Sequence, residues 1–283
     1  MKKITKKAYG KINLFLSVGE LRDDNKHNVE TVMHKIAARD TVTVWEADNE
    51  GITVTCDIPT LSVGRDNLVY KACEEYEKRM GKSVSVSAHI EKRIPVAGGM
   101  GGGSSDCAAT LLALNELYGA LSFDELVDIA ASLGSDIPFF LYEDRAMIGR
   151  GTGEKMSPCT SVKTDMYGLF VMGGQKQSTG AMYASLDAKK AEMKLSGNVS
   201  SSDNIVRALG NGNVSRILKE ILNDFEICSD GFEKAKTELE AFGADKVLLC
   251  GSGPTVCGIF LDKEKAEKAA LGLGGKSFLS EIK

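Results

Sequence analysis

The sequence predicts an α+β fold of two domains. The chain has 283 residues, which exceeds the roughly 150 residues of an average domain and is enough to bury a core without disulfides. Segments with strand alternation mix with segments of helical periodicity, without the strict strand–helix order of a doubly wound sheet. A short polar segment over residues 157–165 indicates a boundary. We therefore expect an N-terminal domain over residues 1–157 and a C-terminal domain over residues 158–283.

Composition and charge exclude several classes of protein. Hydrophobic residues are 43% and charged residues 26% of the chain, which is typical of a soluble globular protein. The net charge of −4 argues against a general nucleic-acid binder. Seven scattered cysteines without a C-x-x-C pair, and only three histidines, predict a reducing compartment and no zinc site. Lys11 and Asn13 interrupt any signal-peptide core, and no apolar run approaches the ~20 residues of a membrane helix.

The first half of the chain alternates strands and helices around a glycine-rich turn. Asn67 is expected to cap a helix that ends at Gly81, and Ser122 with Glu125 forms a capping box at the start of another. The helix after the glycine-rich turn is apolar on nearly every side, which predicts a central, buried position. The expected strands cover residues 11–16, 41–45, 52–56 and 83–90, and the expected helices cover residues 67–80, 104–118 and 122–133.

In the second half of the chain, several helical patterns lie between short apolar strands. The polar stretch over residues 187–202 is expected to be the least ordered part. The expected strands cover residues 167–172, 246–250, 256–261 and 277–282, and the expected helices cover residues 178–186, 203–209, 214–222, 229–242 and 263–271.

A glycine-rich segment between a predicted strand and the buried helix is the strongest functional signal. From Gly98 to Gly103 five of six residues are glycine, and Ser104 and Ser105 follow. Glycines let the backbone adopt positive φ and approach a ligand closely. N–H groups at the start of a helix, together with the helix dipole, favour an anion. We expect a phosphate site here rather than a plain connecting turn, because a connector needs only one or two glycines.

Two common phosphate motifs do not fit this segment. A P-loop continues with Lys-Ser/Thr, whereas Ser104 follows Gly103 here. A Gly-x-Gly-x-x-Gly dinucleotide fingerprint fails in both registers, because Ser104 and Asp106 stand where the third glycine is required. The loop is therefore expected to hold phosphate through its backbone and serines, with a cation supplied from elsewhere.

Lys11 is the candidate for that cation. It lies two residues before Asn13 in an alternating segment, so both side chains share one face of a strand. The local pattern by itself favours a solvated lysine on an edge strand, and both interpretations stay open at this point.

Two further segments combine glycine with polar residues. Asp136 directly precedes an apolar run and is expected to be partly buried. It either caps the turn before Pro138, the commoner use of such an aspartate, or accepts a proton from a substrate hydroxyl. The segment Gly251–Thr255 lies between two apolar strands. It predicts a hairpin turn, or a second glycine loop that packs against the first.

Taken together, these segments resemble the GHMP small-molecule kinase superfamily. Within it, the chain is similar to members that phosphorylate a cytidine diphosphate-linked polyol in non-mevalonate isoprenoid biosynthesis. The glycine–serine loop alone marks only the superfamily, and its combination with Gly-Ser-Asp-Ile-Pro-Phe-Phe is far more specific. The segments that carry the resemblance, in family order, are Lys11–Leu14, Pro95–Ser105, Gly134–Phe140 and Gly251–Thr255, with Gly149–Glu154, Ser178–Thr179, Ser202–Asn204 and Asn223–Glu226 in support.

The resemblance implies an N-terminal ATP domain, a C-terminal substrate domain and a cleft between them. It also implies catalytic roles for two residues, with Asp136 as the base toward the substrate hydroxyl and Lys11 beside it as the neutralising cation. Phosphoryl transfer passes through a loose transition state, so positioning and charge neutralisation are what such a site must supply. The residues implied to bind ATP are Pro95, Gly98, Gly99, Gly101, Gly102, Gly103, Ser104 and Ser105.

The implied cofactors are ATP and Mg²⁺. No carboxylate cage for the metal is visible in the sequence, so Ser104 or Ser105 is the expected ligand. The implied substrate is a small molecule, with no nucleic-acid or membrane partner, and the chain is expected to be a cytoplasmic monomer or homodimer. The residues implied to contact the substrate are Asn13, His27, Asp136 and Thr179, and Tyr183 at the position of an aromatic that stacks on cytosine.

The loop before His27 departs from the family pattern. Where the family has Asp-Gly-Tyr-His, this chain has Asp24-Asn25-Lys26-His27. Loss of an aromatic partner weakens base binding by ~1–3 kcal/mol, if stacking in other proteins is a guide. Two alternative functions follow, a GHMP kinase for a different alcohol and a non-catalytic nucleotide-binding sensor on the same fold. The presence of both Lys11 and Asp136 argues against the sensor.

Overall fold

The chain folds into two compact units that interleave along the sequence. The computed structural model describes residues 2–48, 50–175, 177–195 and 197–282. Unit 1 comprises Met1–Gly10, Ala38–Val96 and Gly101–Glu143, and unit 2 comprises Lys11–Ala37, Ala97–Met100 and Asp144–Lys283. Both units contain helices and strands, so the α+β class is confirmed.

The two units differ from the single boundary expected at residue 157. Strands β1 (Lys3–Leu21) and β2 (His27–Glu46) are long enough to contribute to both units, so contacts do not divide the chain at one position. The assignment of ATP binding to residues 1–157 and of substrate binding to residues 158–283 remains a prediction.

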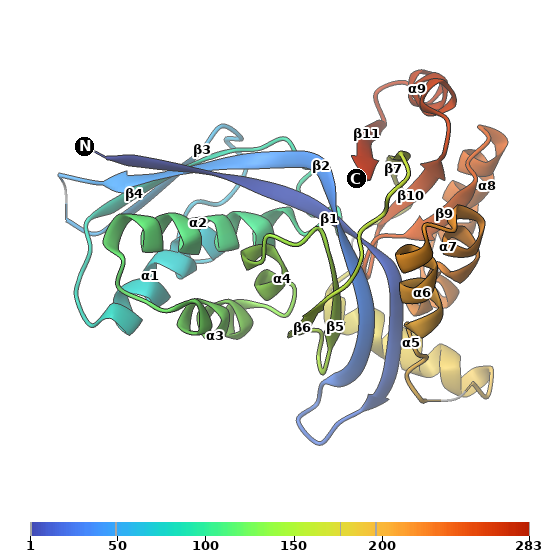
Figure 1. Cartoon of the computed structure of the whole chain (residues 1–283), viewed down its shortest axis with the longest axis horizontal. Helices are drawn as coiled ribbons and strands as arrows, with labels where there is room; N and C mark the ends of the chain where they lie inside the picture. The colour runs from blue at the N-terminus through green and yellow to red at the C-terminus, as the bar shows by residue number, and fades with distance from the viewer. Residues whose placement is uncertain (1, 49, 176, 196, 283) are drawn as a thin grey trace. The chain divides into compact units, whose positions relative to one another are not determined.

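In unit 1, helices cover one face of a sheet whose strand order is β3-β4-β2-β1 (Figure 1). Strand β3 (Ile52–Cys56) runs parallel to β4 (Val86–Glu91), and β4 pairs with β2 in antiparallel register from Thr41↔Glu91 onward. Helix α2 contacts each of the other helices of the unit. The helices are α1 (Leu68–Met80), α2 (Gly102–Tyr118), α3 (Phe123–Leu133) and α4 (Ile137–Leu141).

Local signals explain the ends of these helices. The Asn67 side chain accepts a hydrogen bond from the backbone N of Val69, and α1 ends at Gly81, whose φ is +71°. Ser122 and Glu125 form the predicted capping box at the start of α3. Helix α2 is buried over most of its surface, as its apolar composition predicted. These predictions are confirmed. They could be made from the sequence because each depends on residues that are close together in the chain.

Unit 2 contains the remaining parts of β1 and β2 and a second, antiparallel sheet with the order β11-β7-β10-β9. In the first sheet, β1 pairs in parallel with β8 at Phe15↔Leu222, and β2 pairs with β5 in antiparallel register. The strands are β5 (Ala146–Arg150), β6 (Lys155–Pro158), β7 (Met166–Met172), β8 (Leu222–Asn223), β9 (Lys246–Leu249), β10 (Thr255–Phe260) and β11 (Ser277–Ile282). The helices are α5 (Thr179–Glu192), α6 (Asp203–Asn211), α7 (Val214–Glu220), the 3₁₀ helix η1 (Asp224–Cys228), α8 (Phe232–Ala241) and α9 (Lys263–Gly272).

The core of unit 2 is formed by the second sheet and the helices that pack on it. Leu169, Val256 and Phe260 of the sheet pack with Leu239 of α8 and Ala266 of α9. Helix α5 extends to Glu192, into the stretch that was predicted to be least ordered. Its buried Met182 and Leu186 belong to this same core, and Lys190, within the stretch itself, pairs with Asp224 at 3.0 Å.

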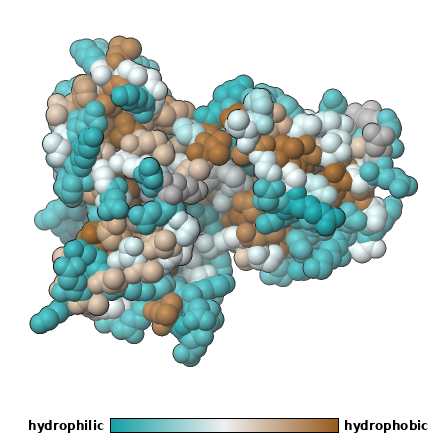
Figure 2. Space-filling model, turned by 180° about the vertical axis from the view of Figure 1, so that it is seen from behind, coloured by the Kyte–Doolittle hydropathy of each residue, from teal (hydrophilic) through white to brown (hydrophobic). Residues whose placement is uncertain are grey.

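Hydrophilic and hydrophobic residues are intermingled on the face seen in Figure 2. Among the described residues, no helix combines the length and apolar character needed to cross a membrane.

Candidate functional site

Lys11 is buried in strand β1 next to Asn13. The two residues are 2% and 3% exposed. The Nζ of Lys11 donates to Oδ1 of Asn13 at 2.6 Å, and Nδ2 of Asn13 donates to Oγ1 of Thr31 at 2.9 Å. Beyond Asn13, strand β1 lies between β2 and β8, which pairs with it at Phe15↔Leu222. The solvated edge-strand lysine that the local pattern favoured is therefore wrong, and Lys11 is a buried, hydrogen-bonded cation.

Two glycine loops of unit 2 pack closely around this lysine. The backbone N of Lys11 donates to the carbonyl of Met100 at 2.9 Å. Gly99 has a φ of +74°, and a Cβ there would collide with the carbonyl of Cys250. A Cβ on Gly251 would lie 3.4 Å from Nζ of Lys11. The segment after β9 is thus both a hairpin turn and a loop packed against the first glycine loop, which confirms the two interpretations together.

The second half of the first loop forms the start of helix α2 in unit 1. The helix begins at Gly102, two residues before the predicted start at Ser104, and the left-handed Gly101 (φ +72°) precedes it. Because nothing caps this end through a side chain, the first N–H groups of the helix are available to a ligand. Ser104 is half-buried and Ser105 is 2% exposed.

A buried ionic cluster supports this helix start from within unit 1. The Nζ of Lys92 donates to Oδ2 of Asp40 at 2.5 Å and to Oδ2 of Asp106 at 2.7 Å. Oδ1 of Asp40 also accepts backbone hydrogen bonds from Arg93 and Ile94. The predictions from the sequence missed this cluster. The signal that was present is a charged residue, Asp106, inside a helix that is otherwise apolar.

The electrostatics of the cluster are set by burial and by an excess of negative charge. The side chains of Lys92, Asp40 and Asp106 are 4%, 0% and 3% exposed. Burial raises the pKa of Asp106 to about 7; Lys92 opposes this rise and Asp40 adds to it. Burial lowers the pKa of Lys92, but its two carboxylate partners more than offset this and raise it overall. Among the described residues, Oδ1 of Asp106 has no hydrogen-bond partner.

The cluster lies directly against the first residue of the helix. A Cβ on Gly102 would lie 3.2 Å from Nζ of Lys92 and 3.5 Å from Oδ2 of Asp40. Gly102 therefore lets the start of α2 approach the cluster closely.

Asp136 is the residue that precedes the short helix α4 in unit 1. It is half-buried, with φ −83° and ψ −16°, and its side chain makes no capping hydrogen bond to that helix. The helix itself is entirely buried and contacts α2 and α3. The structure thus argues against the capping alternative for Asp136.

His27, the first residue of β2, is the first of three aromatic rings of unit 2 that pack in a row. The rings of His27 and Tyr183 are stacked, with centroids 4.7 Å apart and an interplanar angle of 17°. Tyr183 packs edge-on against Phe225 at 5.0 Å. Nε2 of His27 lies 3.1 Å from both carboxylate oxygens of Asp187. Two of the predicted substrate residues, His27 and Tyr183, are therefore in direct contact.

The other two features predicted for this region are exposed. Thr179 is the first residue of α5, and the preceding Ser178 caps the helix by accepting from the backbone N of Ala181. The side chain of Lys26 lies in solvent, and its backbone N donates to Oδ1 of Asp24 in a tight turn. The lysine therefore fills none of the aromatic contacts that the family tyrosine would make.

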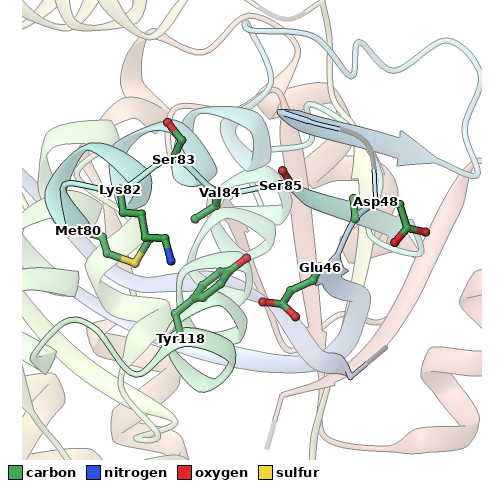
Figure 3. Close-up of a pocket in the computed structure, with 9 residues that line it drawn as sticks. Glu46, Asp48, Met80, Lys82, Ser83, Val84, Ser85 and Tyr118 are labelled. Atoms are coloured by element: carbon green, nitrogen blue, oxygen red, sulfur yellow. The ribbon is translucent and has the colours of Figure 1, made fainter.

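A separate pocket in unit 1 lies away from the predicted site residues. Its volume is about 570 Å³, and its lining includes Glu46, Lys82 and Tyr118 (Figure 3). It lies at the end of α2 opposite to the glycine loop. None of the predicted catalytic or binding residues lines this pocket.

The described part of the chain holds no group of three or more His, Cys, Asp or Glu side chains that is arranged to bind a metal ion. Of the two predicted serine ligands, Ser104 is the more accessible.

Comparison with known proteins identifies the family. Residues 67–144 match the GHMP kinases N terminal domain and residues 203–278 match the GHMP kinases C terminal domain. A 4-diphosphocytidyl-2-C-methyl-D-erythritol kinase from Caldicellulosiruptor saccharolyticus is 34% identical over 281 residues, which cover 98% of this chain and 94% of that protein. The protein of that name from Arthrobacter sp. is 36% identical over 95% of this chain and 88% of its own length. The chain belongs to the 4-diphosphocytidyl-2-C-methyl-D-erythritol kinase family.

Solved structures agree with this family. A crystal structure of a 4-(cytidine 5'-diphospho)-2C-methyl-D-erythritol kinase matches with a TM-score of 0.80 and 28% identity over 98% of both chains. A homoserine kinase from Cytophaga hutchinsonii matches with a TM-score of 0.71 at 16% identity, which shows a shared fold alone. The predicted resemblance to the GHMP kinases is confirmed.

The matched domains of the GHMP kinases contain only part of the predicted site. The N-terminal match includes the glycine loop and Asp136, whereas Lys11, His27 and Tyr183 lie outside both matches. The roles predicted for individual residues in this kinase family therefore remain predictions for the present chain.

Proposed function

We propose that this chain transfers the γ-phosphoryl group of ATP to the 2-hydroxyl of 4-diphosphocytidyl-2-C-methyl-D-erythritol, in non-mevalonate isoprenoid precursor biosynthesis. The observation that carries the proposal is identity of 34–36% over nearly the whole chain to relatives of that name. The geometry of each unit supplies what phosphoryl transfer needs, namely an anion site at a helix start and a buried cation.

The ATP phosphates are assigned to the loop that Pro95 opens and to the first turn of α2. Gly98, Gly99, Gly101, Gly102 and Gly103 allow close approach of the phosphates to backbone N–H groups. When bound, magnesium neutralises phosphate charge, and we assign its protein ligand to Ser104 rather than to the more buried Ser105.

Proton removal and charge neutralisation are assigned to Asp136 and Lys11. Asp136 accepts the proton of the substrate hydroxyl in this assignment, and its half-buried side chain does not cap α4. Lys11 neutralises charge on the transferred group, and Asn13 holds its Nζ in place through the 2.6 Å hydrogen bond. The amide of Asn13 keeps one N–H and one lone pair for the substrate.

The nucleotide end of the substrate is assigned to His27, Thr179 and Tyr183. The stacked His27–Tyr183 pair presents aromatic surface, which suits a pyrimidine base. The exposed hydroxyl of Thr179 offers a donor and an acceptor at the start of α5. Cytoplasmic location and the state of monomer or homodimer remain predictions.

A mass-spectrometric kinase assay with Mg-ATP tests the proposal. The substrates are the cytidyl polyol and, for comparison, homoserine and mevalonate. Gain of one phosphoryl group on the cytidyl polyol alone is the expected result. Phosphorylation of another alcohol, or ATP binding without any phosphorylation, contradicts the proposal and favours a different GHMP kinase or a sensor.

Two variants test the catalytic assignments. Asp136→Asn is expected to lower kcat at least ~100-fold, the usual scale of acid–base assistance. Lys11→Met, which keeps the buried stem, is expected to lower kcat while ATP binding persists. A variant with wild-type turnover removes its residue from the mechanism.

A further inference from the structure

Asp187 makes a two-oxygen contact to His27 that no part of the proposed mechanism uses. Nε2 of His27 lies 3.1 Å from each carboxylate oxygen, and the His27 side chain is 6% exposed. Asp187 follows Tyr183 by four residues on α5, so the two side chains lie on the same face of the helix. The same face of α5 therefore contacts His27 twice. Tyr183 stacks on the plane of the ring, and Asp187 contacts Nε2 at its edge.

The ring stack alone does not fix the orientation of His27. Stacking on Tyr183 sets the plane of the imidazole, and the buried Phe225 supports Tyr183 edge-on. A half-turn of the imidazole about its Cβ–Cγ bond preserves the stack and changes the direction of both nitrogens. The contact between Nε2 and Asp187 removes this freedom, because it ties one nitrogen to a fixed point on α5.

The contact also selects the tautomer of His27. An ionised carboxylate only accepts hydrogen bonds, so Nε2 must carry a proton and donate it. In the neutral imidazole, Nδ1 is then the nitrogen with a free lone pair. Among the described residues, the hydrogen bonds of this ring all go through Nε2. Nδ1 is thus the nitrogen left for a ligand.

We propose that Asp187 is a positioning residue for the nucleotide end of the substrate and acts by fixing the orientation and tautomer of His27. This inference rests on the proposed function, since it takes the cytidyl polyol as the ligand at His27. Asp187 touches neither ATP nor the transferred phosphoryl group in this scheme. Its loss therefore changes the KM for the cytidyl substrate and leaves the chemical step unchanged.

Asp187→Leu and Asp187→Asn separate positioning from a merely structural role. Leucine removes the acceptor at similar size and favours the helix more than aspartate does, so α5 does not weaken. Asparagine restores an acceptor oxygen in the same place. Glu192→Gln is the matched control, because it also removes one negative charge from α5, where Lys189 is the ion-pair partner of Glu192 among the described residues.

Steady-state kinetics with both substrates and a melting curve for each variant give the result. Asp187→Leu is expected to raise the KM for the cytidyl substrate about tenfold, which matches one charge-assisted hydrogen bond. The KM for ATP, kcat and the melting temperature stay at wild-type values, and Asp187→Asn and Glu192→Gln stay within about threefold of the wild type in every constant.

Three outcomes overturn the inference. These are an unchanged KM for the cytidyl substrate in Asp187→Leu, an equal rise in the KM for ATP, and an Asp187→Asn variant no better than Asp187→Leu. Absence of turnover in the wild type is a different result, because it overturns the proposed function and removes the inference with it.

Discussion

Replacement of Lys92 by methionine leaves two carboxylates in the interior of unit 1 without their cation. Methionine keeps the apolar stem and removes the ammonium, so packing changes little. In the wild type, Nζ of Lys92 lies 2.5 Å from Oδ2 of Asp40 and 2.7 Å from Oδ2 of Asp106. All three side chains are at most 4% exposed, so water cannot replace the lost partner.

The expected loss of stability depends on which hydrogen bonds each carboxylate keeps. Removal of one partner of a buried ion pair costs about 3–5 kcal/mol. Asp40 keeps its hydrogen bonds from the backbone N of Arg93 and Ile94. Asp106 loses the hydrogen bond to Oδ2, while Oδ1 has no partner among the described residues, so the cost falls mainly on Asp106. At about 2–4 °C per kcal/mol, the melting temperature of Lys92→Met should fall by roughly 6–20 °C.

Thermal unfolding at pH 8 measures this effect, with Lys78→Met as the control. The Lys78 side chain is 77% exposed and, within the described part of the chain, forms an ion pair with Glu75 on the same helix, so its loss should change stability by less than about 0.5 kcal/mol. The double variant Lys92→Met/Asp106→Asn removes the unpaired carboxylate and should recover at least half of the loss. A Lys92→Met protein that melts within about 2 °C of the wild type refutes the reasoning. So does a double variant that is less stable than the single one.

Three further predictions follow from the same structure. The folded-state pKa of Asp106 is raised to about 7, mainly by burial, from its ordinary 3.8. Between about pH 4 and pH 7 the folded protein therefore keeps a proton on Asp106 that the unfolded chain has lost. The free energy of unfolding then falls by at most about 1.4 kcal/mol per pH unit as pH rises through this range. Asp106→Asn should remove this slope in urea titrations, and a slope equal to the wild type contradicts the assignment. Gly251→Ala places a Cβ 3.4 Å from Nζ of Lys11 and should lower kcat at least about tenfold, whereas Gly243→Ala, also at positive φ but in open space, should lose about 1 kcal/mol of stability and no activity. Ala97 has a φ of +62°, so Ala97→Gly should raise the free energy of unfolding by about 1 kcal/mol, and a less stable variant shows that the loop is not strained there.

The elements that the sequence predicted well are those whose signals are local. Asn67 and Gly81 define both ends of α1, and the Ser122–Glu125 capping box begins α3. The glycine loop also belongs here, since its conformation depends on its own residues, with left-handed φ at Gly99 and Gly101. The strands β5 and β6 were missed because β5 shows no alternation of polar and apolar residues and β6 contains no β-branched residue.

The features that the sequence could not predict depend on pairings between distant segments. Lys11 looks solvated in its own segment, but in the folded chain its backbone N donates to Met100 and its Nζ lies close to Gly251, 240 residues later. The Lys92 cluster joins residues of β2, of the segment after β4 and of α2. No pattern within any one of these segments indicates that it contacts the other two.

The departure at Lys26 shows how such pairings change the meaning of a motif. In the sequence alone, lysine in place of an aromatic residue removes one of two rings from the nucleotide end. In the folded chain, His27 stacks on Tyr183, and α5 supplies both that ring and Asp187, 160 residues from the loop. The stack of His27 on Tyr183 therefore does not depend on residue 26, although the ring that the family has at that position is absent. The substitution instead adds a positive charge on an exposed turn, and a diphosphate-containing substrate tolerates such a charge. Lys26 is thus compatible with a cytidyl diphosphate substrate, and it does not by itself favour a different alcohol.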